Sequence, residues 1–213
     1  MTRPPPLLQV SAMRCERDER LLFESLDFSV DCGEILQVFG PNGSGKTTML
    51  RALAGISARC EGEIRWRGEP RDKVRFEFRR ESLYVGHDAG IKLSLTPIEN
   101  LRWHCSLWGR TREISLEQAL CDVGLEACLE MPAQNLSAGQ RRRVGLARLL
   151  LSPALLWILD EPFTAIDQQG VSQLEGLIQA HAQGGGAVLL TTHHQLGIGF
   201  PVKRLTLGRG LVD

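Results

Sequence analysis

The chain has 213 residues, of which 43% are hydrophobic and 23% are charged. These proportions are ordinary for a soluble globular protein, and the length fits one domain with, at most, an inserted subdomain. The 25 basic and 25 acidic residues cancel, so the surface as a whole has no positive field that would attract a nucleic-acid backbone. The composition therefore weighs against a DNA-binding protein and leaves room only for a local basic patch.

The cysteines and the apolar segments exclude further classes. Six cysteines are scattered along the chain without a C-x-x-C pair or a spacing to histidines that would indicate zinc. We expect them to be reduced thiols in a cytosolic protein. The N-terminal MTRPPPLLQV lacks the apolar core of a secretory signal. The most apolar run, LLLSPALLWIL from Leu149, contains a proline and is too short to span a membrane.

The first half of the chain predicts a strand, a glycine-rich turn and a helix in succession. Residues 35–39 form a short, mostly apolar run that ends at Gly40, which predicts a buried strand. From Thr47 apolar residues recur at helical spacing, and Gly55 is a suitable C-terminal stop. Residues 63–67 then alternate in the manner of an antiparallel strand or arm.

The second half alternates helices with strands. Thr96 as N-cap, Pro97 at the first helical position and Glu99 three residues after the cap predict a helix start. Further on, the patterns predict helices over 116–123, after 137 and over 171–182, and strands over 154–159 and 187–190. This alternation predicts an α/β fold with a mainly parallel sheet, and the helix-rich middle predicts an insertion.

The stretch LSAGQRRR contains a helix start and an unexplained glycine. Ser137 is a preferred N-cap, and Gln140 three residues later completes a capping box. Gly139 in the first helical turn costs about 1 kcal/mol relative to alanine. We therefore expect some group to approach the backbone closely at Gly139.

The turn after the first buried strand matches the phosphate-loop pattern G-x-x-x-x-G-K-[ST] at Gly40, Gly45, Lys46 and Thr47. Backbone N–H groups of such a loop surround phosphate oxygens, the lysine neutralises the terminal phosphates, and the threonine ligates Mg²⁺. The alternative is a plain glycine turn, which the strand and helix around it disfavour. The candidate nucleotide-binding residues are Gly40, Pro41, Asn42, Gly43, Ser44, Gly45, Lys46, Thr47 and Thr48.

Polar residues also follow two later buried strands. LLWILDEP ends with Asp160, positioned to hold Mg²⁺ together with Thr47, and with Glu161, which points elsewhere and orients an attacking water. His193 follows the other strand and would donate to the γ-phosphate or hold the water, whereas we expect His194 to lie in solvent. Taken alone, D-E-P is equally a turn and His193 a solvated histidine. Beside a phosphate loop, Glu161 and His193 become candidate catalytic residues.

Five segments occur in the order and at the rough spacings of the ATP-binding subunits of ABC transporters: GPNGSGKTT, LSAGQ, LLWILDEP, TAID from Thr164 and TTH from Thr191. The resemblance covers essentially the whole chain, and LSAGQ is its most specific part. It implies an ATPase that uses ATP and Mg²⁺. It also implies one P-loop ABC ATPase domain over residues 1–213, with an antiparallel β arm and a helical subdomain at about 95–150.

The resemblance implies partners as well. Such domains bind ATP at the interface of a head-to-tail dimer, so the LSAGQ loop of one copy caps the γ-phosphate held by the other. That loop consists of Leu136, Ser137, Ala138, Gly139 and Gln140, and Asp167 would belong to a neighbouring dimer-interface loop. Integral membrane permease subunits would place the protein peripherally at the cytoplasmic face of the inner membrane, without nucleic acid.

Within the family, CERDERLLF from Cys15 and LYVGHDAGIKLSLTPIENLRW from Leu83 resemble the ATPase subunit of the haem exporter of cytochrome c maturation. The likeness implies haem delivery as the pathway, either by transport of haem or by release of a haem-carrying chaperone. Alternatives are the ATPase of another small-substrate transporter, a soluble ABC clamp acting on nucleic acid, and a nucleotide-binding regulator that no longer hydrolyses.

Two features depart from the family pattern. Most relatives carry a glutamine where this chain has Asp88, and an aspartate there would still ligate Mg²⁺. The aromatic residue that usually stacks on adenine is missing, so Arg17 or Arg20 would stack instead by a cation–π contact, unless both simply face solvent. Trp103 and Trp108 in the helical insertion are predicted as core residues, with a groove for a membrane partner's helix as the alternative.

Overall fold

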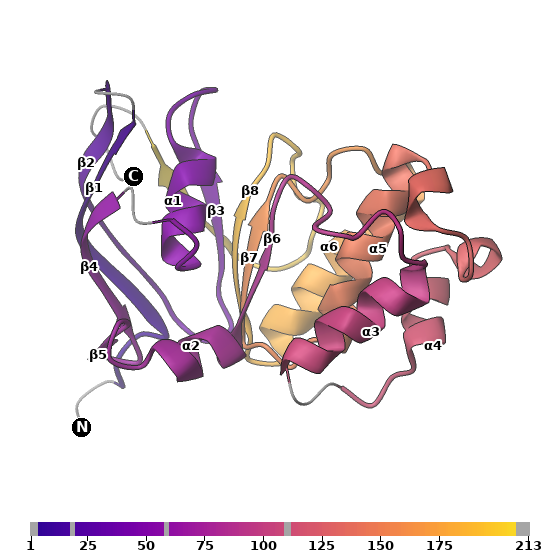
Figure 1. Ribbon diagram of the computed structural model, residues 1–213. Coiled ribbons are helices and arrows are strands. Elements are labelled where there is room, and N and C mark those ends of the chain that lie inside the picture. The colour runs from indigo at the N-terminus through magenta and orange to yellow at the C-terminus, as the bar shows by residue number, and fades with distance from the viewer. Residues whose placement is uncertain (1–3, 18–19, 58–59, 109–111, 208–213) are drawn as a thin grey trace.

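The computed structural model describes residues 4–17, 20–57, 60–108 and 112–207, which form two sheets and a set of helices (Figure 1). The strands are β1 Leu8–Arg17, β2 Arg20–Val30, β3 Ile35–Phe39, β4 Cys60–Trp66, β5 Glu69–Pro70, β6 Ser82–Val85, β7 Leu156–Asp160, β8 Ala187–Thr191 and β9 Val202–Thr206. The α-helices are α1 Lys46–Leu53, α2 Arg75–Glu81, α3 Pro97–Trp108, α4 Leu116–Cys121, α5 Ala138–Leu151 and α6 Gln168–Gln183, with 3-10 turns at Glu126–Cys128 and Ala133–Asn135.

A parallel sheet with the order β6-β7-β8-β3-β9 forms the centre of the fold. Its central strands β7, β8 and β3 are buried on both faces because both faces are covered. On β7, Leu156 and Ile158 join a core shared with α1 and the second sheet, whereas Trp157 and Leu159 join a core shared with α5 and α6. The predicted mainly parallel α/β fold is confirmed.

The second sheet is antiparallel, with the order β2-β1-β4-β5, and it stands beside α1 (Figure 1). The antiparallel arm predicted at 63–67 is confirmed as β4. The two longest strands, β1 and β2, were not predicted, because register shifts and left-handed residues at Ala12 (φ 50°) and Ser25 (φ 54°) interrupt their alternation. Irregular strands of this kind give a weak sequence pattern.

Helices α3, α4 and α5 pack around a core cluster of their own, on the opposite side of the parallel sheet from the antiparallel one (Figure 1). Leu101, Leu120 and Val144 are fully buried in this cluster, one from each helix. The chain enters these helices after β6 and returns to the sheet at β7. Among the residues described above, no helix combines the length and apolar character needed to cross a bilayer. All six cysteines are free thiols.

The predicted helix starts are confirmed by their caps. Ser137 Oγ accepts from the backbone N–H of Gln140 at 3.1 Å, and the Gln140 side chain accepts from the Ser137 N–H at 2.8 Å. Thr96 and Glu99 form the same reciprocal pair at 3.2 and 2.9 Å. At the other end of a helix, Gly55 follows α1 with φ 71°, as its role as a stop requires.

Other boundaries differ from the predicted ones. β7 begins at Leu156, two residues later than predicted, because the apolar residues after Pro153 still belong to the turn from α5. α6 begins at Gln168, three residues earlier, because Asp167 caps it through the Gly170 N–H at 3.0 Å. The short elements α2, β6 and β9 were not predicted, since so few residues give no clear period.

Candidate active site

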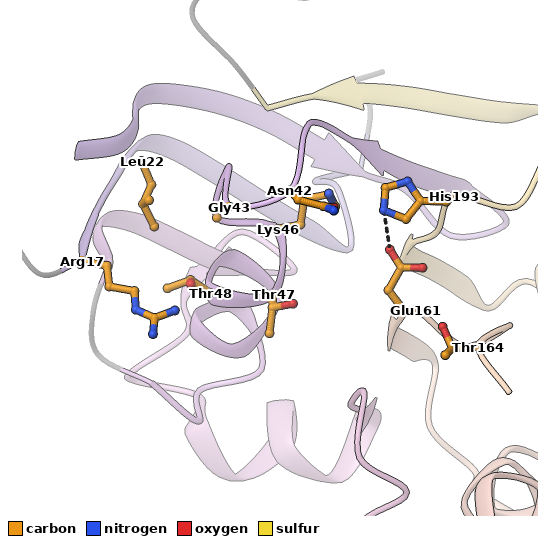
Figure 2. A pocket seen from close by; sticks show the side chains of 11 residues that line it. Arg17, Leu22, Asn42, Gly43, Lys46, Thr47, Thr48, Glu161, Thr164 and His193 are labelled. Carbon is orange, nitrogen blue, oxygen red and sulfur yellow. Dashed lines mark ion pairs between the residues drawn. The ribbon is translucent and has the colours of Figure 1, made fainter. Parts of the chain in front are cut away.

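A cavity of about 400 Å³ lies beside the phosphate loop, where the turns after β3, β7 and β8 meet (Figure 2). Lys46 and Thr47 line it from the loop and the start of α1, and Glu161 and His193 line it from the turns after β7 and β8. In parallel sheets the strands' carboxyl ends form the edge where ligands bind. The structure thus brings three predicted segments, far apart in sequence, to one cavity.

The phosphate loop is shaped by close packing and by its lysine. A Cβ atom on Gly40, which has φ 152°, would lie 2.6 Å from the carbonyl oxygen of Leu207, so only glycine fits there. The Lys46 ammonium donates to the carbonyl oxygens of Gly40 at 2.6 Å and Pro41 at 3.2 Å. The cation and the N-terminus of α1 together favour an anion over this loop.

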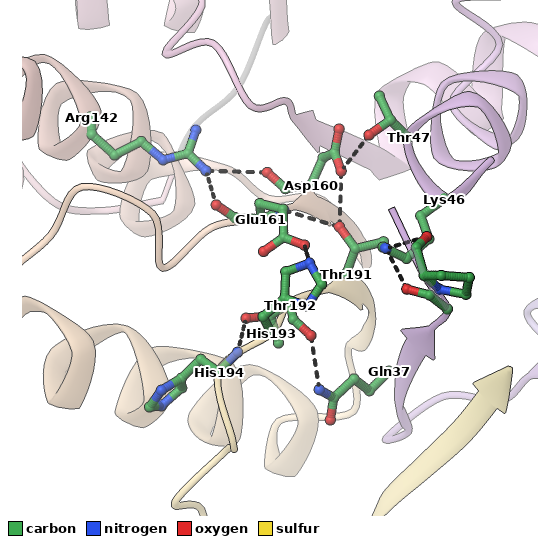
Figure 3. A network of polar contacts seen from close by, with 12 residues as sticks. Gln37, Lys46, Thr47, Arg142, Asp160, Glu161, Thr191, Thr192, His193 and His194 are labelled. Atoms are coloured by element: carbon green, nitrogen blue, oxygen red, sulfur yellow. Dashed lines mark hydrogen bonds and ion pairs between the residues drawn. The ribbon is translucent and has the colours of Figure 1, made fainter. Parts of the chain in front are cut away.

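Asp160 is 1% exposed, and one of its two carboxylate oxygens is free of hydrogen bonds. Oδ1 accepts from the hydroxyls of Thr47 at 3.1 Å and Thr191 at 2.8 Å, and these contacts meet at one atom in Figure 3. Oδ2 is buried without a partner. A carboxylate oxygen and a hydroxyl are hard donors of the kind that Mg²⁺ accepts, with phosphate and water as its other ligands. The residues present therefore fit a magnesium ion.

Glu161 has different surroundings from its neighbour Asp160. Its backbone is left-handed, with φ 47°, and its N–H lies 3.1 Å from the Thr191 carbonyl oxygen and 3.0 Å from the Thr191 hydroxyl oxygen. Its carboxylate lies 3.7 Å from Nε2 of His193, whose side chain is 67% exposed. Asp160 thus faces α1 while Glu161 faces the cavity, the division of directions that the sequence predicted.

Arg142 is a site residue that sequence reasoning missed. Arg142 is 4% exposed, and its guanidinium donates to four carbonyl oxygens: Gly86 at 2.5 Å, His87 at 3.0 Å, Asp160 at 3.3 Å and Glu161 at 2.8 Å. Figure 3 shows the contacts with Asp160 and Glu161. Burial lowers the pKa of Arg142, and nearby carboxylates oppose that shift.

Helical spacing could not have identified Arg142. Residues 144–149 are all buried, so Arg141 and Arg143 also stand three and four residues before buried positions of α5. Residue type alone does not separate it from the neighbouring Arg141 and Arg143.

Asp88 lies in the loop between β6 and α3, outside the cavity that holds Glu161 and His193. It lines a second cavity of about 620 Å³, which also reaches Thr47 and Tyr84. Of the other two magnesium candidates, Thr47 lines this cavity together with Asp88 and Asp160 does not.

Side chains of α3 hold the loop that carries Asp88. Asn100, fully buried, accepts from the Lys92 N–H at 2.7 Å and donates to the Lys92 carbonyl oxygen at 3.0 Å. His104 Nε2 lies 3.1 Å from the Gly90 carbonyl oxygen. Burial, with a smaller contribution from Arg148, lowers the pKa of His104 to about 4, so this imidazole is neutral and donates to Gly90.

The loop Leu136–Gln140 lies at the start of α5, and it lines neither of these two cavities. A Cβ atom on Gly139 would lie 2.8 Å from the carbonyl oxygen of Ala165 in the same chain. The close approach expected at Gly139 exists, but a contact within the chain already accounts for it. This contact gives one reason for a glycine at position 139, and the role of the loop toward a ligand on a second copy stays a prediction.

Asp167 comes two residues after Ala165 in the sequence, and it links α5 to α6. Its Oδ1 accepts from the Gly170 N–H at 3.0 Å and from Arg143 Nη2 at 2.6 Å. The bond from Gly170, followed by that from Arg143, lowers the pKa of Asp167. The carboxylate is thus held ionised at the exposed junction of the two helices.

Three further expectations have mixed outcomes. Arg17, not Arg20, lines the cavity beside the phosphate loop, at the end away from Glu161 (Figure 2). The prediction that His194 faces solvent is wrong, because it pairs with Glu175 at 3.0 Å and packs on Phe163.

The tryptophans of α3 also differ from each other. The prediction of Trp103 as core is wrong, since 39% of it is exposed and Lys92 lies over its ring at 4.3 Å. Trp108 is half-buried and packs against two core clusters.

Comparison with known proteins identifies close relatives. The family model described as ABC transporter matches residues 23–164. The chain is 50% identical to the cytochrome c biogenesis ATP-binding export protein CcmA of Hahella chejuensis, over 98% of this chain and 99% of that one. It is 51% identical to the protein of the same name in Pseudomonas fluorescens, over 90% of each.

Solved structures show the same architecture. An ATP-binding subunit of an ABC transporter has a TM-score of 0.77 and 26% identity, covering 88% of this chain and 79% of its own. A putative ABC transporter ATP-binding protein from Pyrococcus furiosus has the same score and identity, over 94% and 96%. A dimeric ATP-binding cassette bound to ADP and phosphate, 21% identical with a TM-score of 0.79 over 95% and 97%, shares the fold.

Proposed function

Since the chain belongs to the ABC transporter family, and within it to the cytochrome c biogenesis ATP-binding export proteins, it is an ATPase subunit, and we propose that its ATP turnover drives haem export for cytochrome c assembly. The observation that carries the proposal is the cavity where Lys46, Glu161 and His193 meet. A cation for phosphates and a carboxylate for water, placed in one cavity, are the parts that phosphoryl transfer to water needs.

Each residue has a role in hydrolysis. On ATP binding, Lys46 would exchange the loop carbonyls for the terminal phosphates. Thr47 and Asp160 would hold Mg²⁺, which neutralises charge on the β and γ oxygens when bound. Glu161 would orient the attacking water, and His193 would donate to the γ-phosphate. Arg17 would lie against the adenine, at the far end of the cavity (Figure 2).

We further propose a head-to-tail dimer. The exposed side chain of His193 leaves the γ-phosphate end of the cavity uncovered in one chain. The exposed Ser137 at the N-terminus of α5 offers a hydroxyl and a positive helix end that would cover that phosphate from a second copy. The segment with Asp167 adjoins this loop through Ala165, so it would share the dimer interface.

The membrane partner would dock on the helical side. We propose residues 95–150 as a helical subdomain of a single ATP-binding domain, peripheral at the cytoplasmic face. Leu93, Trp103 and Leu107 expose 48%, 39% and 64% of their surface, and apolar and aromatic groups favour such interfaces. They lie along α3 and the loop before it, next to Asp88. An integral membrane permease, not nucleic acid, fits these exposed apolar and aromatic side chains.

The decisive experiment replaces Glu161 with Gln in the complex purified from detergent-solubilised membranes. Turnover should fall at least about 100-fold, since the water loses its base, while ATP affinity changes little and light scattering detects a stable dimer with Mg-ATP. Glu175→Gln is the matched control, because Glu175 binds His194 outside the cavity.

In cells, Glu161→Gln should stop the appearance of haem-containing c-type cytochromes, measured by haem staining. Normal cytochrome assembly would contradict the haem pathway, and undiminished hydrolysis by Glu161→Gln would contradict the role of Glu161.

A further inference from the structure

We propose that Arg142 is a positioning residue that couples the two ATP sites of the dimer, an inference that rests on the proposed function. Ser137, which would cover the phosphate held by the partner copy, is the N-cap of helix α5, and α5 carries Arg142 in its second turn. Arg142 forms hydrogen bonds with the loops of the ATP site in its own chain. One helix thus joins the site of the partner to the site of its own chain.

The guanidinium of Arg142 is one planar group, and it donates hydrogen bonds to two loops. Nη1 donates to the carbonyl oxygens of Gly86 and His87, directly before Asp88. Nη2 donates to the carbonyl oxygens of Asp160 and Glu161. Because the guanidinium is rigid, the loops after β6 and β7 keep a set distance from each other and from α5.

The contact with Glu161 bears on catalysis. A left-handed backbone at a non-glycine residue is strained and persists only where its surroundings hold it. Thr191 holds the N–H of Glu161, and Arg142 holds its carbonyl oxygen at 2.8 Å. A displacement of α5 would therefore turn the peptide that aims the Glu161 carboxylate.

A buried cation is costly unless it has hydrogen-bond partners. Arg142 has them at Nη1 and Nη2, while its Nε is buried without one, so a substitution there affects stability as well as the link between the loops. The same helix supplies the comparison. Arg148 is 6% exposed, but it donates to Gly145 within α5 at 2.8 Å and to Ala89 at only 3.4 Å. It touches neither Asp160 nor Glu161, so it shares the burial of Arg142 without the link.

The test compares Arg142→Gln and Arg142→Lys with Arg148→Gln in the purified membrane complex, over a range of ATP concentrations. For Arg142→Gln we expect kcat to fall about 10- to 100-fold and the Hill coefficient for hydrolysis to fall from near two to near one. ATP affinity should stay within about 3-fold, because Arg142 does not line the phosphate cavity. Arg142→Lys keeps the charge but reaches only one loop, so it should also lose cooperativity.

Arg148→Gln reports the effect of an altered buried arginine alone, and thermal unfolding is measured for all variants. A Hill coefficient near that of the wild type in both Arg142 variants overturns the inference. Parallel losses of ATP affinity, kcat and melting temperature in Arg142→Gln and Arg148→Gln overturn it too, because they show a structural role. A wild-type complex without cooperativity, or a Glu161→Gln variant that stays monomeric, instead overturns the dimer of the proposed function and this inference with it.

Discussion

Thr191 contacts both members of the Asp160–Glu161 pair. Its hydroxyl donates to Asp160 Oδ1 at 2.8 Å and accepts from the Glu161 N–H at 3.0 Å. Both contacts are buried or nearly so, and a buried carboxylate that loses a donor keeps its desolvation cost. One side chain thus serves the magnesium candidate and the backbone of the catalytic candidate.

Thr191→Val keeps the shape of the side chain and removes these two bonds. We expect the free energy of unfolding to fall by about 1–3 kcal/mol and kcat to fall with it, because Glu161 is less well held. Urea unfolding and steady-state hydrolysis measure both effects. Thr192→Val is the control, because the Thr192 hydroxyl only accepts from the His194 N–H. Equal stability of the wild type and Thr191→Val would contradict the role of Thr191.

Arg17 supplies a test of the nucleotide's orientation. If the Arg17 guanidinium faces the adenine, Arg17→Ala should weaken ATP binding about 2- to 5-fold and leave the binding of tripolyphosphate unchanged. If Arg17 contacts a phosphate instead, Arg17→Ala should weaken the binding of both ligands. Arg17→Trp should restore ATP affinity. Arg20→Ala is the control, since Arg20 does not line the cavity. Fluorescence titration would decide, and weaker binding only in Arg20→Ala would reverse the assignment.

At the scale of elements, α5 is held by close contacts along its length. Its first turn approaches Ala165, its arginines bind the segments before and after it, and Gly145 approaches Ala89, where a Cβ atom would lie 2.8 Å from the carbonyl oxygen. Such backbone contacts tolerate no added side chain. The start of α5 therefore packs so closely on the segment with Asp167 that an added methyl group would not fit between them.

Gly139→Ala should move that start. We expect normal ATP binding by the single chain, because the loop does not line the cavity, but loss of the Mg-ATP-dependent dimer in a Glu161→Gln background. Light scattering measures the dimer. Gly176→Ala in α6 is the control, since nothing lies near its added Cβ, and it should stabilise the protein by about 0.5–1 kcal/mol. A full dimer with Gly139→Ala would show that the loop does not form the interface.

Elements with a local signal, including the apolar strands β3, β7 and β8, were predicted well, and strands without such a signal were not. The capping residues Ser137 and Thr96 mark their helices within a few positions of sequence. Strands β1 and β2 depend on partners across the sheet and contain left-handed residues, so alternation did not reveal them. The short β6, at the edge of the parallel sheet, gives too few residues for a period.

For the whole molecule, buried histidines make stability depend on pH. Burial lowers the pKa of both His104 and His181 to about 4, against about 6.5 in the unfolded chain. Between these two pKa values the histidines are protonated in the unfolded chain but neutral in the folded chain. The free energy of unfolding is therefore highest above about pH 6.5 and decreases as the pH falls towards 4. Each histidine contributes at most about 3 kcal/mol to this loss.

His181→Phe tests this dependence. The phenyl ring can keep the stack that His181 makes on Trp157, at 3.8 Å between ring centres, while the contact with the Leu155 carbonyl oxygen is lost. Urea unfolding between pH 4.5 and 6.5 should give a slope smaller by about 1.4 kcal/mol per pH unit. An unchanged slope would mean that His181 does not titrate on unfolding.

The sequence by itself indicated that this protein is an ATPase, because the phosphate loop and the Asp160–Glu161 pair are local patterns of adjacent residues, and together with the LSAGQ turn they carry the resemblance to the ABC transporter family. Only the tertiary structure decided which arginine of three is buried at Glu161, and why Gly139 cannot carry a side chain. The physical reason is that burial and close approach are set by segments far apart in sequence, which meet only when α5 packs against the parallel sheet.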